Sequence, residues 1–156
     1  MSLCIGVISD THGLLRPEVA GALKGCQHII HAGDVGSWGV IGGLQEISPV
    51  TAVRGNSDWE PWSRGLPEVV DFECVGLRIH LIHDLQYLHL DPRKPSPDVV
   101  IHGHTHSPKV DWREGTLFLN PGSAGPPRPG KPIVLARLWV QEGGGIEVER
   151  VDLLAE

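Results

Sequence analysis

Short, mostly apolar segments separated by polar loops run through the first third of the chain. The segments 3–8, 28–31 and 50–53 have the length and composition of buried strands. Helices are expected over about 17–24 and 37–47, because a proline opens the first and a serine can cap the second. Strands and helices that alternate in this way predict a parallel sheet with helices on its outside.

The pattern changes in the second half, where strand-like segments come in pairs separated by short turns. Three hairpins are expected, over 69–83, 109–119 and 133–153, with turns at Gly76, Glu114-Gly115 and Gly143 to Gly145. Another buried strand is expected at 99–102, after a proline-rich stretch. The two halves together predict two sheets packed face to face in an α/β fold.

Length and composition predict a single globular domain over residues 1–156, since 40% hydrophobic residues provide for a sizeable core. The 20 glycines and 13 prolines indicate many tight turns, with the chemistry placed on loops. The formal net charge is −6, from 19 acidic and 13 basic residues. Without a basic face, strong binding to nucleic acid is not expected.

The cellular setting is predicted from patterns that the sequence lacks. Cys4, Cys26 and Cys74 are odd in number and form no CxxC pair, which argues against a disulfide framework or a thiolate zinc site. Residues 1–10 do not have the pattern of a signal peptide, and no apolar run approaches the ~18 residues that cross a bilayer. We therefore expect a cytoplasmic protein that does not enter a membrane.

Polar side chains that can bind metal ions follow the expected strands, each just after a strand's carboxyl end. They are Asp10, His12, Asp34, Asn56, His83, His104 and His106. Each fragment alone would also be explained by a turn, a helix cap or a hydrogen-bonded histidine, but their conjunction at equivalent strand ends favours one shared site. Carboxylate, amide and imidazole donors suit Mn, Fe, Co, Ni or Zn, and seven candidates suit two ions that share a carboxylate.

These residues belong to a series of motifs that covers positions 10 to 123. The motifs are Asp10-Thr11-His12, Gly33-Asp34, Gly55-Asn56-Ser57-Asp58, His83, Gly103-His104-Thr105-His106 and Asn120-Pro121-Gly122-Ser123. In this order they resemble the calcineurin-like metallophosphoesterase superfamily, in its small bacterial and archaeal phosphodiesterase branch. The resemblance implies a four-layer α/β/β/α sandwich, in which two mixed β-sheets are flanked by helices.

The resemblance also implies a dinuclear metal site. The implied ligands are Asp10, His12 and His106 for one ion and Asn56, His83 and His104 for the other, with Asp34 bridging both. A hydroxide that bridges the ions would attack phosphorus, so no covalent enzyme intermediate is expected. Manganese is the expected metal, and Asp34, Asn56 and His104 are the expected catalytic residues.

Two positions near the site depart from related patterns. In this branch a glycine usually follows the histidine at position 83, whereas this chain has Asp84, which could add a ligand, orient His83 or face solvent. Where protein phosphatases have a histidine thought to protonate the leaving group, this chain has Ser57. The loop after Asp34 also lacks the arginine of protein phosphatases and dinucleoside tetraphosphatases, which argues against those activities.

Other residues are candidates for contact with a substrate. Arg54 precedes the asparagine loop and Arg128 follows the last motif, so both are assigned to substrate binding, with a surface arginine as the alternative. Trp59 and Trp62 could stack a base, although tryptophans are more often core residues. Asp58 is expected behind the metal ligands.

We therefore predict a metal-dependent hydrolase of phosphodiester bonds in small molecules. No insertion between the motifs is long enough for a cap domain, so the site should be shallow and its substrate range broad. The alternative is a non-catalytic scaffold that reuses the fold for protein binding, as retromer's phosphoesterase-like subunit does after losing several ligands. A nuclease of the DNA-repair type would need a basic or capping segment that the sequence lacks. The sequence leaves open whether the chains form a homo-oligomer.

Overall fold

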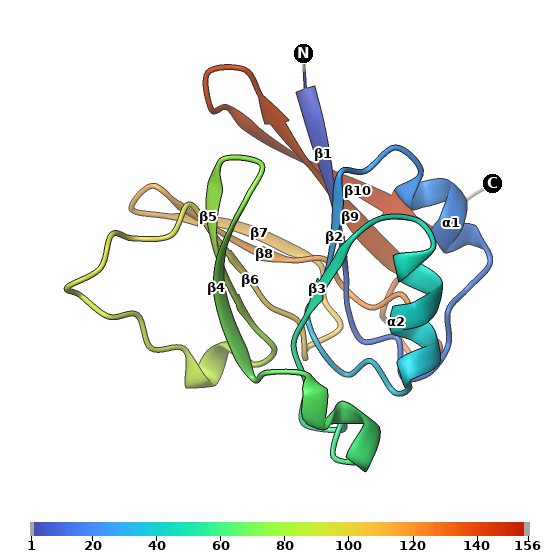
Figure 1. Ribbon diagram of the computed structural model, residues 1–156. Coiled ribbons are helices and arrows are strands. Elements are labelled where there is room, and N and C mark those ends of the chain that lie inside the picture. The colour runs from blue at the N-terminus through green and yellow to red at the C-terminus, as the bar shows by residue number, and fades with distance from the viewer. Residues whose placement is uncertain (1, 155–156) are drawn as a thin grey trace.

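The computed structural model describes residues 2–154, in which two five-stranded sheets pack face to face (Figure 1). The first sheet consists, in spatial order, of β10 (Ile146–Asp152), β9 (Val134–Gln141), β1 (Ser2–Ile8), β2 (His28–His31) and β3 (Val50–Ala52). The second sheet consists of β4 (Val69–Cys74), β5 (Leu77–Ile82), β6 (Val99–Ile101), β8 (Thr116–Asn120) and β7 (Lys109–Arg113). All ten strands lie within the segments that the sequence predicted, to within two residues at their ends.

The first sheet contains both the first and the last strand of the described residues. Its strands β1, β2 and β3 run parallel, whereas β9 pairs antiparallel with β1 and with β10. The hairpin of β9 and β10 was predicted from the sequence, but the sheet to which it belongs was not. Both sheets are consequently mixed, since β6 of the second sheet runs parallel to β5 and β8 while its outer pairs are antiparallel.

Within residues 2–154, the α-helices pack on the first sheet alone. α1 (Glu18–Leu23) and α2 (Trp38–Gln45) pack on its outer face, at the right of Figure 1, and both match the predicted segments. The predicted side-chain cap by Ser37 was wrong, because the Ser37 side chain makes no cap hydrogen bond. Beside the second sheet lie the 3₁₀ helix η2 (Leu85–Tyr87) and the irregular segment 88–98, whose three prolines lack the N–H groups that a helix needs. The predicted α/β fold of two flanked sheets is thus confirmed, with unequal outer layers.

Two apolar layers hold the sheets and helices together. Ile5 and Val7 of β1 face the second sheet, where they pack in one cluster with Ile79 and Leu81 of β5. Ile8 belongs to the other cluster, between the first sheet and the helices. Because both faces of this sheet are buried, β1 is continuously apolar rather than alternating, as is typical of such strands.

The cysteines are free and buried, and the Sγ atoms of Cys4 and Cys26 lie 3.1 Å apart. The predicted turns at Gly76 and Gly115 are two-residue hairpin turns in which the preceding residues, Val75 and Glu114, also have positive φ. Among the residues that the structure describes, no helix has both the length and the apolar character required to cross a membrane.

Candidate metal centre

Five loops meet at one edge of the sheets, each directly after the end of a strand. They follow β1, β2 and β3 of the first sheet and β5 and β6 of the second. The loops bring together Asp10, His12, Asp34, Asn56, His83, His104 and His106. Parallel strands explain this convergence, because their carboxyl ends lie on the same side of a sheet.

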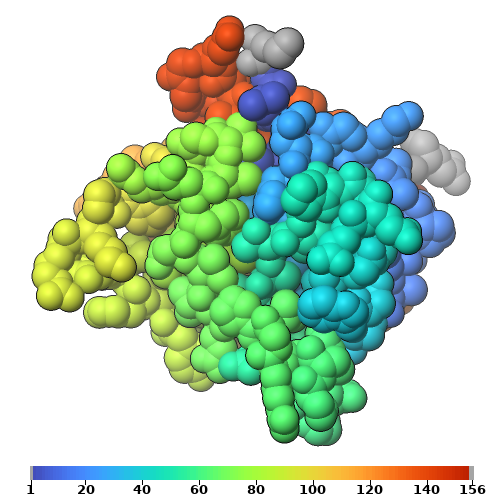
Figure 2. Space-filling model, viewed as in Figure 1, coloured from blue at the N-terminus to red at the C-terminus, as the bar shows by residue number. Residues whose placement is uncertain are grey.

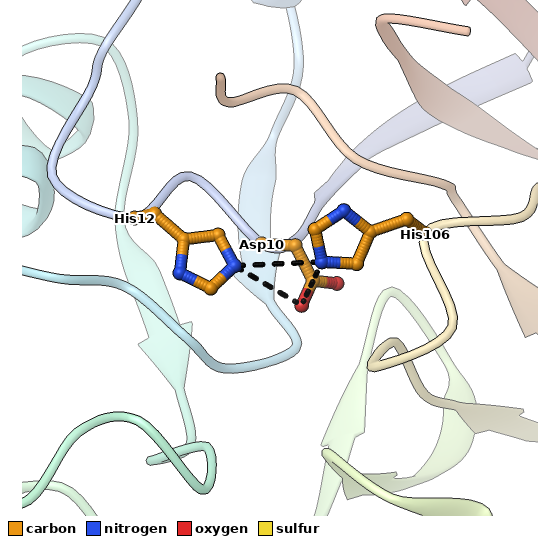
Figure 3. A group of neighbouring side chains, drawn as sticks. All are labelled: Asp10, His12 and His106. Carbon is orange, nitrogen blue, oxygen red and sulfur yellow. Dashed lines mark hydrogen bonds and ion pairs between the residues drawn. The ribbon is translucent and has the colours of Figure 1, made fainter. Parts of the chain in front are cut away.

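The first group of ligand candidates consists of Asp10, His12 and His106 (Figure 3). Asp10 Oδ1 lies 3.4 Å from His106 Nε2 and 3.9 Å from His12 Nε2. The two Nε2 atoms are 3.4 Å from each other. One carboxylate oxygen and two imidazole nitrogens thus point at a common position, which is a donor set that divalent transition metals accept.

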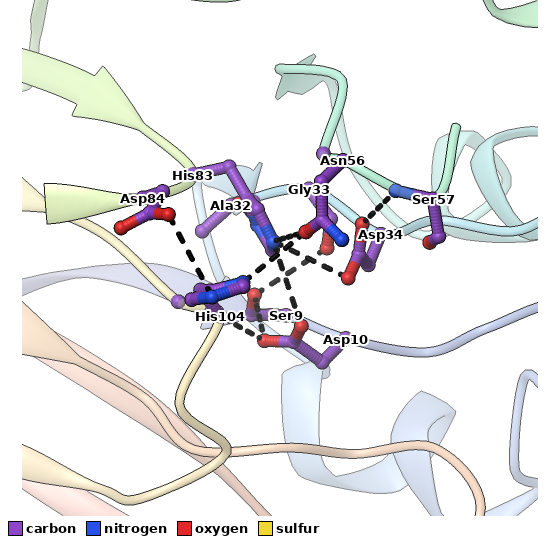
Figure 4. A network of polar contacts seen from close by, with 12 residues as sticks. Ser9, Asp10, Ala32, Gly33, Asp34, Asn56, Ser57, His83, Asp84 and His104 are labelled. Carbon is purple, nitrogen blue, oxygen red and sulfur yellow. Dashed lines mark hydrogen bonds and ion pairs between the residues drawn. The ribbon is translucent and has the colours of Figure 1, made fainter. Parts of the chain in front are cut away.

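The second group consists of Asp34, Asn56, His83 and His104 (Figure 4). Asn56 Oδ1 lies 3.1 Å from His83 Nε2 and 3.1 Å from His104 Nδ1. Asp34 Oδ2 lies 3.3 Å from His83 Nε2. The donors are again oxygen and imidazole nitrogen, so the same class of metal ion suits both groups.

Asp34 lies between the two groups. Its Oδ2 is 3.8 Å from His12 Nε2 of the first group, in addition to its contact with His83 in the second. Asp10 Oδ1 is in turn 4.0 Å from His83 Nε2. The groups are therefore contiguous, and a carboxylate in the position of Asp34 can be shared by two cations.

An unpaired buried atom indicates that a cation fits the first group. Among the described residues, Asp10 Oδ1 is a buried side-chain atom without a hydrogen-bond partner, and it lies 3.4 Å from His106 Nε2. Asp10 is fully buried, and this burial raises the pKa of its carboxyl, although a hydrogen bond from Ser9 opposes the shift. A buried charged atom without a partner is costly, and a metal ion held between Asp10 Oδ1 and the neighbouring imidazoles would satisfy it.

The protonation of the histidines differs between the groups. Burial, aided by the charge of Arg128, lowers the pKa of His106 to about 4, so its ring is neutral and able to bind a metal ion at pH 7. Burial also disfavours the charged form of His83, but the ion pair with Asp34 outweighs it and raises the pKa of His83. That pair and the Ser57 N–H hold the pKa of Asp34 below its usual range despite burial.

The orientation of the His83 ring is fixed by the backbone. The His83 Nδ1–H donates to the Ala32 carbonyl at 2.7 Å, which leaves Nε2 facing the second group.

The backbone at the site is unusual. Five of the seven ligand candidates have φ between +47° and +73°: Asp10, His12, Asp34, His104 and His106. Aspartate and histidine are among the non-glycine residues that enter this left-handed region most readily, and such residues concentrate at functional sites. The glycines that precede the ligands allow close approach, because a Cβ at Gly55 would lie 2.1 Å from Asp34 Oδ1 and one at Gly103 would lie 2.2 Å from Ser9 Oγ.

Asp58 supports the site from behind, as the sequence analysis expected. Its carboxylate accepts hydrogen bonds from the N–H groups of Val35, Gly36 and Gly55, at 2.9 to 3.0 Å. Asp58 therefore ties the loop after β2 to the loop after β3, which fixes the distance between Asp34 and the asparagine loop.

The last sequence motif also supports the loops and does not reach the metal groups. Asn120 Nδ2 donates to the Gly103 carbonyl at 3.1 Å, and Ser123 Oγ donates to the Asp10 carbonyl at 3.0 Å. Asn120 therefore fixes the backbone next to His104 of the second group, and Ser123 fixes the backbone of Asp10 in the first group.

The two departures from related patterns have clear positions in the structure. Asp84 Oδ2 lies 3.6 Å from His104 Nε2, and Asp84 Oδ1 accepts the Gln86 N–H (Figure 4). Asp84 therefore faces His104 rather than His83, which none of the three sequence-based alternatives anticipated. Ser57 is exposed, and its N–H donates to Asp34 Oδ1 at 3.0 Å.

The two candidate arginines lie on different sides of the centre. Arg54 lines a cleft beside the second group and pairs with exposed Glu68 at 3.0 Å. Arg128 is exposed in the loop 126–130, near enough to the first group that its charge depresses the pKa of His106.

Of the two tryptophans that the sequence proposed for stacking, the structure places only one at the site. Trp59 is 79% exposed and lines the cleft beside the second group. Trp62 is half-buried and packs against the cluster under the helices. Tyr87 lines the same cleft as Trp59 and was not identified from the sequence, in which its only signal is its place three residues after Asp84.

Comparisons with known proteins agree with this geometry. A family model described as the calcineurin-like phosphoesterase superfamily domain matches residues 3–143. The chain is 37% identical over 145 residues to a probable metallophosphoesterase of Methanothermobacter thermautotrophicus, covering 85% of this chain and 84% of that protein. It is 31% identical over 159 residues to phosphodiesterase YfcE of Escherichia coli K12, covering 80% of each. A Vps29 structure from Entamoeba histolytica, a single mutant, matches with a TM-score of 0.71 and 25% identity, over 96% of this chain and 99% of that one.

Proposed function

Because the chain belongs to the calcineurin-like phosphoesterase superfamily, we propose that it hydrolyses phosphodiester bonds of small molecules with two bound divalent metal ions. The observation that carries the proposal is the position of Asp34, whose Oδ2 lies 3.3 Å from His83 and 3.8 Å from His12, between two groups of metal donors. Manganese is the expected metal, with Fe, Co, Ni or Zn as the others that mixed oxygen and nitrogen donors accept.

The same proposal extends to the organisation of the protein. We expect residues 1–156 to form one metallophosphoesterase domain without a cap, which the family match over 3–143 supports. The free cysteines support the predicted cytoplasmic location.

We assign each ligand candidate to an ion by its group. Asp10, His12 and His106 would hold one ion and Asn56, His83 and His104 the other, with Asp34 shared. When bound, the ions would supply Lewis-acid chemistry, activating water as the nucleophile and neutralising charge on the phosphoryl oxygens.

The side chains around the ions divide the remaining tasks. Asn56 and His104 lie on the open side of the centre, where the side chain of His104 is 41% exposed, so a phosphoryl group would approach there. Arg54 and Arg128 flank the centre and would attract the anionic substrate. Ser57 is not an acid near neutral pH, so the chain offers no proton donor at the position where protein phosphatases have histidine.

The alternative function is a non-catalytic scaffold for protein binding. The fold shared with Vps29 is compatible with that reading. The complete set of seven donors, converging within hydrogen-bonding or ion-pair distance, favours the enzyme, because a scaffold has no need to keep a buried and unpaired carboxylate oxygen among them.

Metal analysis and hydrolysis assays on one preparation test the proposal. We expect two ions per chain and hydrolysis of bis(p-nitrophenyl) phosphate when Mn²⁺, Co²⁺ or Ni²⁺ is added to metal-free protein. Asp34→Asn should bind fewer ions and lose at least about 10²-fold in turnover, more than the loss of an outer partner of a ligand causes. Glu147→Gln, at an exposed position on β10, is the matched control and should behave as wild type.

Two outcomes would count against the enzyme. A folded Asp34→Asn protein that binds no metal and keeps wild-type turnover would contradict the proposal. A metal-loaded wild-type protein that is inactive on a broad panel of phosphoesters would favour the scaffold.

A further inference from the structure

A cleft of about 740 Å³ opens beside the second metal group. Its lining includes Asn56 and His83 of that group, together with Arg54, Val69, Trp59 and Tyr87. The cleft is therefore continuous with the centre at which a phosphoryl group would be held, and it is large enough for a substituent of small-molecule size.

The outer part of the cleft exposes aromatic surface. Trp59 is 79% exposed and Tyr87 70% exposed, and Val69 beside them is 44% exposed. Trp59 precedes the 3₁₀ helix η1 (Pro61–Gly65) and Tyr87 ends η2, so the two rings come from the segments before β4 and after β5. Both segments lie along the lower edge of the molecule in the views of Figures 1 and 2. Large exposed rings beside a reaction centre point to a planar ligand, since stacking gains free energy from any aromatic face.

The charges of the cleft disfavour a second anionic group. Among the described residues of the lining, Arg54 is the one arginine or lysine, and it is paired at 3.0 Å with Glu68, which also lines the cleft. Asp58 and Asp84 also contribute to the lining, and the charge of Asp58 is held by three backbone N–H groups. Outside the metal groups the lining is thus net negative, which suits an uncharged substituent rather than a chain of phosphates.

We propose that this cleft holds an uncharged aromatic group of the substrate, stacked on Trp59 and Tyr87, while the phosphodiester lies at the metal centre. Nucleoside phosphodiesters and aryl phosphodiesters share this chemistry. The assignment rests on the proposed function, because it takes the reacting phosphorus to lie beside Asn56 and His83.

Binding of two phosphate monoesters that differ only in the aromatic group tests the cleft directly. Calorimetric titration of the Mn²⁺-loaded protein compares AMP, a product of nucleoside phosphodiester hydrolysis, with ribose 5-phosphate, which has the same charge and no base. Stacking is worth roughly 1–3 kcal/mol per base, so AMP should bind about 5- to 160-fold more tightly. Trp59→Ala and Tyr87→Ala should each lose most of that ratio and leave the affinity for ribose 5-phosphate unchanged. Trp112→Ala removes a 54% exposed tryptophan from β7 and should keep the ratio.

The outcomes separate this inference from the proposed function. Equal affinity for AMP and ribose 5-phosphate, or a ratio unchanged in both cleft variants, would overturn the aromatic assignment even if the enzyme hydrolyses phosphodiesters. An intact AMP preference in a protein that hydrolyses no phosphoester would overturn the proposed function and leave the aromatic cleft standing.

Discussion

In the first group, Asp10 Oδ1 is buried without a hydrogen-bond partner among the described residues. In the second group, by contrast, Asn56 Oδ1 lies within hydrogen-bond distance, 3.1 Å, of both His83 Nε2 and His104 Nδ1. There His83 Nε2 lies 3.3 Å from Asp34 Oδ2, and although burial opposes the shift, this pairing raises the pKa of His83. The groups also differ in access, since the side chain of His106 is 5% exposed and that of His104 is 41% exposed.

This difference indicates a division of tasks within one centre. In the first group, Asp10 Oδ2 accepts hydrogen bonds from Ser9 Oγ and the His104 N–H, but Asp10 Oδ1 has no hydrogen-bond partner. This group should therefore govern metal affinity and the stability of the metal-free protein. The second group pairs its carboxylate with His83 and borders the cleft, so it should govern how the substrate is bound. Variants of each group, and of the residues behind them, test this division.

The largest expected effect concerns the leaving group, on the side of the second group. Without an acid at Ser57, rates of aryl phosphodiester hydrolysis should depend steeply on the acidity of the phenol, and bis(p-nitrophenyl) phosphate should be cleaved far faster than alkyl diesters. Ser57→His should accelerate diesters with poor leaving groups, and general acid catalysis sets an upper range of about 10²–10⁴-fold. Ser57→Ala should keep the wild-type slope. A flat wild-type series, measured where chemistry limits turnover, would show that another residue donates the proton.

The next effect concerns pH and the hydrogen bonds behind the first group. The Gly33 N–H donates to His31 Nδ1, so the His31 Nε2–H donates to Thr11 Oγ1, beside Asp10 and His12. Burial lowers the pKa of His31 from 6.5 to about 3. The unfolded chain therefore binds the proton first, and stability should fall as pH decreases from 6.5 toward 3, by about 1.4 kcal/mol per pH unit for this residue.

His31→Asn tests that assignment in metal-free protein. Asparagine can still accept the Gly33 N–H but does not titrate, so the slope of the unfolding free energy against pH should decrease by about one proton. Urea unfolding at several pH values between 6.5 and 4.5 measures it. A variant slope equal to that of wild type would contradict a neutral, buried His31.

Asp84 should act on the second group alone. Its carboxylate faces His104 Nε2 at 3.6 Å and can orient that ring through its outer nitrogen. Asp84→Asn keeps the oxygen that accepts the Gln86 N–H but loses the charge, and outer partners of this kind are worth about 10- to 100-fold in metal affinity. Titration with Mn²⁺ should show weaker binding of one ion and unchanged binding of the other. Asp91→Asn, in the segment 88–98, is the control, and weakening of both ions or of neither would contradict the assignment.

The smallest effect has opposite consequences in the two groups. Asp10→Asn removes the unpaired buried charge, so the metal-free variant should be more stable than wild type by about 1 kcal/mol while losing the stabilisation that metal ions give. His104→Ala changes an exposed loop position and should leave metal-free stability within about 0.5 kcal/mol of wild type. Thermal unfolding with and without Mn²⁺ compares them. A metal-free Asp10→Asn protein less stable than wild type would remove the physical basis of the division.

The positions of the metal ligands could be predicted from the sequence because these residues directly follow the ends of recognisable strands. Apolar runs such as 3–8 identify buried strands, and parallel strands place Asp10, Asp34 and Asn56 at one edge without further information. The partner of the C-terminal hairpin could not be predicted, because β9 carries no residue that marks β1 as its neighbour.

The contacts of Asp84 and Tyr87 could not be predicted from the sequence either. Both lie around η2, where a short 3₁₀ helix turns one side chain to His104 and another to the cleft. A segment of this length is too short to show a hydrophobic periodicity. The directions of the Asp84 and Tyr87 side chains therefore could not be predicted from the sequence pattern.

The close backbone contacts of the ligand loops have a consequence for how this protein can change over evolutionary time. Side chains are sterically forbidden at Gly55 and Gly103, so the loops that carry the metal ligands admit few substitutions without displacing Asp34 or Ser9. Trp59 and Tyr87, by contrast, project into solvent and support no core cluster. Selection or a protein engineer can therefore replace the cleft wall in many ways while the reaction centre is inherited unchanged.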